Sequence, residues 1–176
     1  KYWLQWKEGS DVQEPLNRGV LQMLNKDRFL EIIHDFIVFD TGVKKTCRHN
    51  QYFGIRAAQK RIQKREGGII WHTQGSGKSL TMVWLAKWIR ENQENSRVLI
   101  ITDRTELDEQ ITDVFAGVDE SITRATSGEN LLGLLNKSQP WLMCSLVHKF
   151  RGDHESASDD ETSEFLRELK KSKAQG

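Results

Sequence analysis

The sequence predicts an α/β fold with a mostly parallel sheet, and three observations along its 176 residues support this class. An apolar run at residues 69–71 precedes a glycine-rich stretch that ends in Gly77, Lys78 and Ser79. A long, mostly apolar segment with helical spacing follows, and a second apolar run, 98–102, closes the unit. A strand, a glycine-rich turn, a helix and a second strand form the βαβ frame of a phosphate-binding loop (P-loop).

The residue types in the glycine-rich stretch are those that a nucleotide phosphate requires. Glycines allow the backbone to turn sharply and to bring its N–H groups onto phosphate oxygens, beside the positive end of the next helix. Lys78 is expected to reach the β- and γ-phosphates of ATP as the catalytic residue, and Ser79 to ligate Mg²⁺. The predicted nucleotide-binding residues of the loop are Thr73, Gln74, Gly75, Ser76, Gly77, Lys78 and Ser79.

One position departs from the strict P-loop pattern, which has glycine where this chain has His72. The alternative to a P-loop is a chance glycine-rich turn on a surface loop. The apolar run directly before the stretch and the helical pattern directly after it favour the P-loop, because they supply the context that the motif needs.

Composition indicates a globular protein, with 37% hydrophobic and 29% charged residues. No apolar run approaches the roughly 18 residues of a membrane helix, and the start of the chain has no leader pattern. We therefore expect no membrane association and a cytoplasmic location. Cys47 and Cys144 lie far apart, which favours a reducing compartment without disulfides. The chain begins without Met, as an excised piece of a longer protein would.

Charge is unevenly distributed although the net charge is only +1. Residues 44–66 contain eight basic residues and one acid, and residues 153–168 contain seven acids and one base. A basic row on the predicted helix 52–65 is open to two interpretations, a solvated helix face or a contact with nucleic-acid phosphates. The row consists of Arg56, Lys60 and Lys64.

The N-terminal part predicts two short helices, 15–24 and 28–36, followed by a brief extended segment at 37–39. These elements are expected to form a helical arm, residues 1–47, beside a nucleotide-binding domain, residues 48–176. Residues 41–46 are predicted as a basic loop. Gln51, at the start of the next helix, either offers its amide to an adenine edge or is a helix cap.

The second half of the chain predicts further α/β elements. Helices are expected at 105–115 and after Gly128, and strands at 98–102 and 141–145. In the helix after Lys78, we expect Trp84 and Trp88 to belong to the core rather than to stack on bases. The five histidines show no metal-ligand spacing.

Hydrolysis of ATP also needs an acid that holds the metal, usually as Asp-Glu at the end of an apolar strand. Asp119-Glu120 resembles this pattern superficially. The apolar residues before it complete a helix that Gly117 ends, so we interpret the pair as a helix-terminal turn.

Three segments together closely resemble the motor (R) subunit of type I restriction-modification enzymes: 48–52, 67–79 and 99–108. The resemblance implies a partial first RecA-like lobe of a superfamily 2 DNA translocase that uses ATP and Mg²⁺. It also implies double-stranded DNA, a methyltransferase subunit and a specificity subunit as partners. The acidic Asp-Glu-Ala-His motif, the second lobe and the nuclease acids of that family are not found in this sequence.

Residue by residue, the resemblance implies that Gln51 recognises the nucleotide and that Asp103 and Arg104 contact the DNA backbone. Thr126 and Ser127 resemble the next DNA-contacting motif. Two rival interpretations remain open: another superfamily 2 helicase or remodeller, and a non-catalytic nucleic-acid-binding module that keeps the fold.

Overall fold

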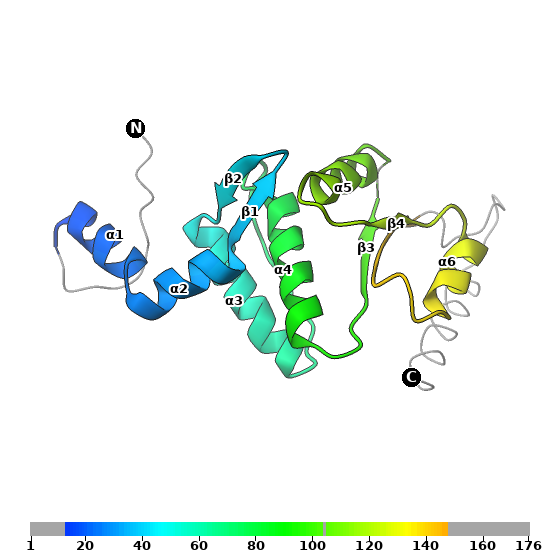
Figure 1. The fold of residues 1–176 in the computed structure, drawn as a ribbon, viewed down its shortest axis with the longest axis horizontal. Coiled ribbons are helices and arrows are strands. Elements are labelled where there is room, and N and C mark those ends of the chain that lie inside the picture. Colours follow the sequence, from blue (N-terminus) through cyan, green and yellow to red (C-terminus); the bar gives the residue numbers. More distant parts are fainter. Residues whose placement is uncertain (1–12, 104, 148–176) are drawn as a thin grey trace. The chain divides into compact units, whose positions relative to one another are not determined.

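The computed structural model describes residues 13–103 and 105–147, and the chain separates into two compact units, Lys1–Asn92 and Gln93–Gly176 (Figure 1). The acidic segment 153–168 and Arg104 lie outside the described residues. The described elements are α1 (Pro15–Met23), α2 (Lys26–Asp35), β1 (Ile37–Asp40), β2 (Val43–Thr46), α3 (His49–Gln63), α4 (Lys78–Asn92), β3 (Val98–Thr102), α5 (Thr105–Gly117), β4 (Thr123–Arg124), α6 (Gly128–Leu135) and β5 (Leu142–Leu146).

The first unit begins with the two predicted helices of the N-terminal arm, and each has a side-chain cap. Glu14 caps α1 by accepting a hydrogen bond from the backbone N–H of Asn17 at 2.7 Å. Asn25 caps α2 by accepting one from the N–H of Arg28 at 3.3 Å. Such caps satisfy N–H groups that have no partner inside the helix, so they fix where the two helices begin.

Residues 41–46, predicted as a basic loop, instead form the turn and the second strand, β2, of a hairpin. β1 and β2 pair antiparallel along their whole length. Thr41 and Gly42 connect them with positive φ angles of 49° and 80°, the geometry of a two-residue hairpin turn. Lys45 forms an ion pair with Asp40 across the two strands. This turn and the cross-strand pair explain why the segment is a strand.

The core of the first unit forms where α3 and α4 pack side by side (Figure 1). The ring of Phe36 lies 5.1 Å from that of Tyr52 and 6.3 Å from that of Trp84, measured between centroids. Trp84 is 1% exposed, and Trp88 is also buried. The prediction that both tryptophans belong to the core is confirmed.

The apolar run 69–71, predicted as the first strand of the βαβ unit, is irregular in the structure. Ile69 and Trp71 are 89% and 90% exposed. A strand needs a neighbour to take up its backbone N–H and C=O groups. In the described part of the chain this run pairs with no strand, and the strand prediction is wrong here.

The second unit contains a three-stranded parallel sheet in the order β3-β5-β4. All five residues of the central strand β5 are buried, as expected for an apolar strand between two neighbours. Val98 lies opposite Leu142, and Thr102 lies opposite Leu146. The strands predicted at 98–102 and 141–145 are therefore present, the second shifted by one residue.

Helices α5 and α6 connect the strands of this sheet, as the sequence predicted. Arg97 fixes the end of α6, because its guanidinium donates to the carbonyls of Leu135 at 2.7 Å and Leu134 at 2.6 Å. Carbonyls in the last turn of a helix lack intrahelical partners, so this contact satisfies two of them. No helix in the described ranges is both long and apolar enough to cross a membrane. The predicted α/β class, with a parallel sheet and an N-terminal helical arm, is confirmed.

Candidate nucleotide-binding loop

The loop between residues 72 and 78 curls back on itself directly before α4. Ser76 donates to the carbonyl of Thr73 through its backbone N–H at 3.4 Å and through its hydroxyl at 2.7 Å. Gly75 and Gly77 have φ angles of +75° and +82°, which only glycine adopts without strain. The two glycines therefore provide the turn for which the sequence predicted them.

The ammonium group of Lys78 lies against the backbone of this loop. Its Nζ donates to the carbonyl of Thr73 at 3.0 Å and to that of His72 at 3.4 Å. Lys78 is exposed, so water competes with both bonds. A phosphate entering the loop can take the ammonium from these carbonyls, because a full negative charge attracts it more strongly than a carbonyl dipole does.

Gln51 connects α3 to the loop. This buried side chain accepts a hydrogen bond from the N–H of Arg48 at its Oε1 and donates one to the carbonyl of Gly77 from its Nε2, both at 2.8 Å. The first bond gives Gln51 the helix-cap role. An amide offers two donors and two acceptor sites, so capacity remains for the adenine contact, which stays a prediction.

Gly77 also makes room for this contact. A Cβ atom at Gly77 would lie 2.4 Å from Nε2 of Gln51, far inside van der Waals contact. Glycine is therefore needed at this position both for its positive φ angle and for the close approach of Gln51.

The remaining predicted loop residues surround the start of α4. Thr73 and Gln74 are exposed, and Ser79 is half-buried in the first helical turn. Backbone N–H groups of a first turn have no intrahelical partners and favour anions. Together with the ammonium of Lys78, these donors fit a phosphate group, and the Ser79 hydroxyl is the type of oxygen ligand that Mg²⁺ takes. The catalytic role of Lys78 and the metal role of Ser79 stay predictions.

Two hollows lie near the loop. A cavity of about 480 Å³ lies between α3 and residues 66–72, with His72 in its lining. A smaller hollow of about 120 Å³ is bordered by Lys78 and Thr81, and also by His72. Lys78 borders the smaller hollow, but apolar side chains of Ile70, Met82 and Leu85 also line it. Residues 73–77 line neither of these two hollows, so the phosphate-binding prediction depends on the loop itself.

In the second unit, the predicted DNA-contacting residues follow two parallel strands. Asp103 comes directly after β3 and is exposed. Thr126 and Ser127 lie between β4 and α6. The Ser127 hydroxyl caps α6 by accepting a hydrogen bond from the N–H of Asn130, and the Asn130 side chain accepts one from the N–H of Thr126, both at 3.1 Å. Parallel strands end at the same edge of a sheet, so these three residues lie at one edge. Their contact with DNA, like that of Arg104, stays a prediction.

The pair Asp119-Glu120 lies in the turn after α5, where Asp119 has a φ angle of +60°. The N–H of Glu120 donates to the carbonyl of Phe115 at 3.0 Å, which closes the helix end. The pair does not follow a strand, which supports its interpretation as a helix-terminal turn.

The basic row on α3 divides into two parts. Arg56 forms an ion pair with Glu31 at 2.9 Å and donates to Gln59 at 3.0 Å, so it links α3 to α2. Lys60 and Lys64 are exposed and lie on the solvent side of the helix. The structure therefore gives Arg56 a role inside the unit and leaves both interpretations of the two lysines open.

With this geometry in hand, comparison with known proteins defines the class. Residues 50–174 match the SWI2/SNF2 ATPase family, and the chain belongs to it. A Methanocaldococcus jannaschii protein named for the type I restriction enzyme MjaIXP endonuclease subunit is 32% identical over 74% of this chain and 14% of its own length. The HindI endonuclease subunit of Haemophilus influenzae is 30% identical over 60% of this chain and 11% of its own. The type I restriction enzyme SsaAORF53P endonuclease subunit of Staphylococcus saprophyticus is 31% identical over 82% of this chain and 16% of its own length.

These relatives confirm the resemblance to type I restriction enzyme subunits that residues 48–108 predicted. The chain spans less than one sixth of the length of these relatives: 14%, 11% and 16%, respectively. It is thus similar to one segment of a much larger endonuclease subunit.

Proposed function

We propose that the chain is the ATP-binding segment of the DNA-translocating and DNA-cleaving subunit of a type I restriction-modification enzyme. The observation that carries this proposal is the curled loop at the start of α4, with the Lys78 ammonium held on its carbonyls. The family supports ATP as the nucleotide, and the names of the relatives support a restriction system.

In this proposal the chain's own groups bind and orient the triphosphate. The N–H groups from Gly75 to Ser79 donate to phosphate oxygens, and Lys78 exchanges the carbonyls of Thr73 and His72 for the β- and γ-phosphates. Ser79 would hold Mg²⁺ through its hydroxyl, and Gln51 connects the loop to α3 through its bond to Gly77. When bound, ATP with Mg²⁺ would supply, through its hydrolysis in the complete enzyme, the free energy for movement along duplex DNA.

The remaining parts of the chain have proposed roles in the larger subunit. Residues 1–47 form the arm that leads from a nuclease domain, and residues 48–176 form part of the first RecA-like lobe. The sheet edge that carries Asp103 and Ser127 faces double-stranded DNA. The methyltransferase and specificity subunits of a cytoplasmic complex are the proposed protein partners. We expect the isolated chain to bind ATP weakly and not to hydrolyse it.

Calorimetric titration of the chain with ATP and Mg²⁺ tests the proposal directly. Replacing Lys78 with Ala removes one charge-assisted contact, worth roughly 1.5–3 kcal/mol, so affinity should fall about tenfold to hundredfold. Lys64→Ala removes an exposed lysine directly after α3 and is the matched control, with affinity unchanged. Equal affinities for all three proteins would overturn the proposal.

Two further results would favour the rival functions. Salt-sensitive binding of duplex DNA that persists in Lys78→Ala, without any protection by nucleotide, would favour a non-catalytic nucleic-acid-binding module. A parent gene without a nuclease signature upstream of this segment would favour another helicase or remodeller.

A further inference from the structure

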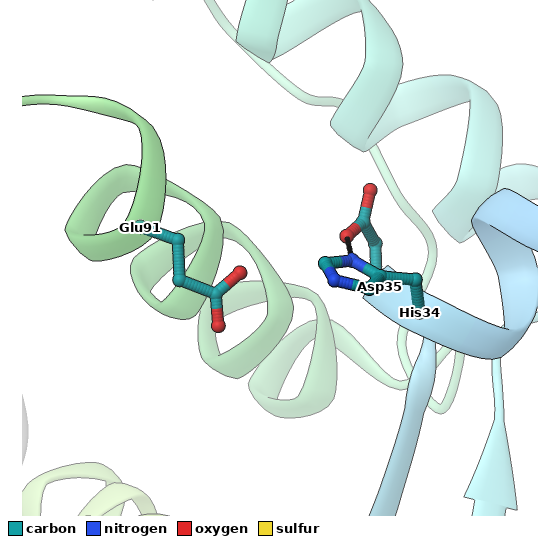
Figure 2. Close-up of side chains that lie close together, drawn as sticks. All are labelled: His34, Asp35 and Glu91. Atoms are coloured by element: carbon teal, nitrogen blue, oxygen red, sulfur yellow. Dashed lines mark hydrogen bonds and ion pairs between the residues drawn. The ribbon is translucent and has the colours of Figure 1, made fainter.

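Three ligand-type side chains that are distant in the sequence meet where two helices of the first unit end. His34 and Asp35 are the last two residues of α2, and Glu91 is the next-to-last residue of α4. One potential ligand atom from each lies within 4.8 Å of the other two. Figure 2 shows the His34 ring between the two carboxylates, with Glu91 facing it from α4. Sequence spacing gave no sign of this cluster, because Glu91 lies far along the chain from the other two.

We propose that His34, Asp35 and Glu91 bind one divalent transition-metal cation of the Zn²⁺ type. The set offers one imidazole nitrogen and two carboxylate oxygens, which are established ligands of zinc. The imidazole favours zinc and its transition-metal neighbours over Mg²⁺, which prefers oxygen ligands. The site is therefore separate in position and in chemistry from the Mg²⁺ that the nucleotide-binding loop is proposed to use.

The electrostatic setting of the cluster favours a cation. The carboxyl-terminal ends of α2 and α4 each place partial negative charge near the cluster, because the last carbonyls of a helix have no intrahelical partners. The carboxylates of Asp35 and Glu91 add full negative charges. His34 already associates with one of them, since its Nδ1 lies 2.5 Å from Oδ1 of Asp35.

The spacing of the ligand atoms fits a site that closes on the metal. Ligand atoms about 2.0–2.2 Å from one tetrahedral zinc lie roughly 3.3–3.6 Å from one another, which is within the 4.8 Å span of this cluster. Glu91 must therefore move closer, and the 2.5 Å contact between Nδ1 of His34 and Oδ1 of Asp35 must open. The side chain of His34 is 78% exposed and Glu91 is exposed as well, which lets both rotate inward. The same exposure gives the metal a path from solvent.

A metal held here would connect the arm helix α2 to α4, the helix that begins with the nucleotide-binding loop. A cation that binds the folded chain better than the unfolded chain raises its stability. We therefore expect Zn²⁺ both to bind and to raise the melting temperature of the first unit.

Calorimetric titration of the whole chain with Zn²⁺ in the absence of nucleotide tests the proposal. Wild type should bind one Zn²⁺ per chain, and His34→Gln and Glu91→Gln should each weaken binding by about 10-fold to 100-fold. Glu94→Gln, which removes an exposed acid just beyond the end of α4, is the matched control and should bind as wild type does. Mg²⁺ should give no signal in any of these proteins.

Bound Co²⁺ supplies a second readout, because its visible absorption reports the ligand set. The spectrum of wild type should change in His34→Gln, which loses the nitrogen ligand. Zn²⁺ affinity that is equal in wild type, His34→Gln and Glu91→Gln would place the metal on other histidines of the chain and overturn the proposal. Absence of Zn²⁺ binding to wild type would overturn it as well.

Discussion

Two apolar runs of this chain were both predicted as strands, but only one of them forms a strand in the structure. In the second unit, Leu142–Leu146 is fully buried between β3 and β4. In the first unit, residues 69–71 are irregular, and Ile69 and Trp71 are about 90% exposed. Apolar character thus marks a potential strand, but the strand forms only where a neighbouring strand completes its backbone hydrogen bonds.

The same polar substitution in the two runs is expected to give the largest contrast. Leu142→Asp places a charge in a position that is 0% exposed, and a buried charge without a partner costs several kcal/mol. The second unit should lose its cooperative unfolding transition in circular dichroism. Trp71→Asp, at a position that is 90% exposed, should change stability by no more than about 0.5 kcal/mol. A large loss in Trp71→Asp would show that the run is structured in solution.

A second substitution tests how much the core between α3 and α4 stabilises the first unit, in which residues 69–71 form no strand. Trp84 is 1% exposed at the centre of its core, so Trp84→Ala should lower the free energy of unfolding by about 3–5 kcal/mol. Trp84→Phe should cost less, because the indole nitrogen has no hydrogen-bond partner among the described residues. Urea unfolding followed by circular dichroism measures both. Equal losses in the two variants would contradict this account of the core.

The sequence predicted most elements that depend on local pattern. The glycines of the loop, the helix that starts at Lys78 and the apolar strand 98–102 all follow from residue types at short spacing. The strand at 69–71 failed because its formation depends on a partner that local pattern does not contain. The hairpin strand Val43–Thr46 was missed because two basic residues concealed its pairing with β1.

Contacts between distant residues were beyond reach of the sequence for the same reason. The bond from Gln51 to the carbonyl of Gly77 joins residues 26 positions apart. The cluster that includes His34 and Glu91 depends on α2 and α4 ending at the same place. Residue types alone indicated the phosphate chemistry of the loop, but they did not indicate which groups hold the loop in shape.

Two glycine substitutions sharpen the contrast between irregular and regular backbone. Gly77→Ala forces a Cβ against Gln51 at a φ angle of +82°, and we expect a loss of about 1–3 kcal/mol in stability. Gly133→Ala lies within α6, where an added Cβ meets no atom within 4 Å, and should stabilise the chain by about 0.5–1 kcal/mol. Thermal unfolding of both variants measures the difference. A neutral Gly77→Ala would show that Gln51 does not hold the loop in solution.

The smallest effect on stability at neutral pH is expected from titration of the thiol of Cys47, a buried residue of the first unit. Burial raises the pKa of its thiol from 9.0 to about 12. The folded chain therefore keeps this proton to higher pH than the unfolded chain does. The stability that Cys47 contributes is complete below pH 9 and is lost as the pH rises toward 12. Urea unfolding between pH 7 and pH 11 should show a steeper decline for wild type than for Cys47→Ala, and parallel curves would contradict the burial of this thiol.

The loop before α4 is proposed to bind the phosphates of ATP. Mapping of backbone amide resonances during titration with ATP and Mg²⁺ tests it most directly. The largest shifts should fall on residues 73–79, and Lys78→Ala should weaken the response. Shifts that leave residues 73–79 unchanged and cluster elsewhere, or that persist equally in Lys78→Ala, would contradict it.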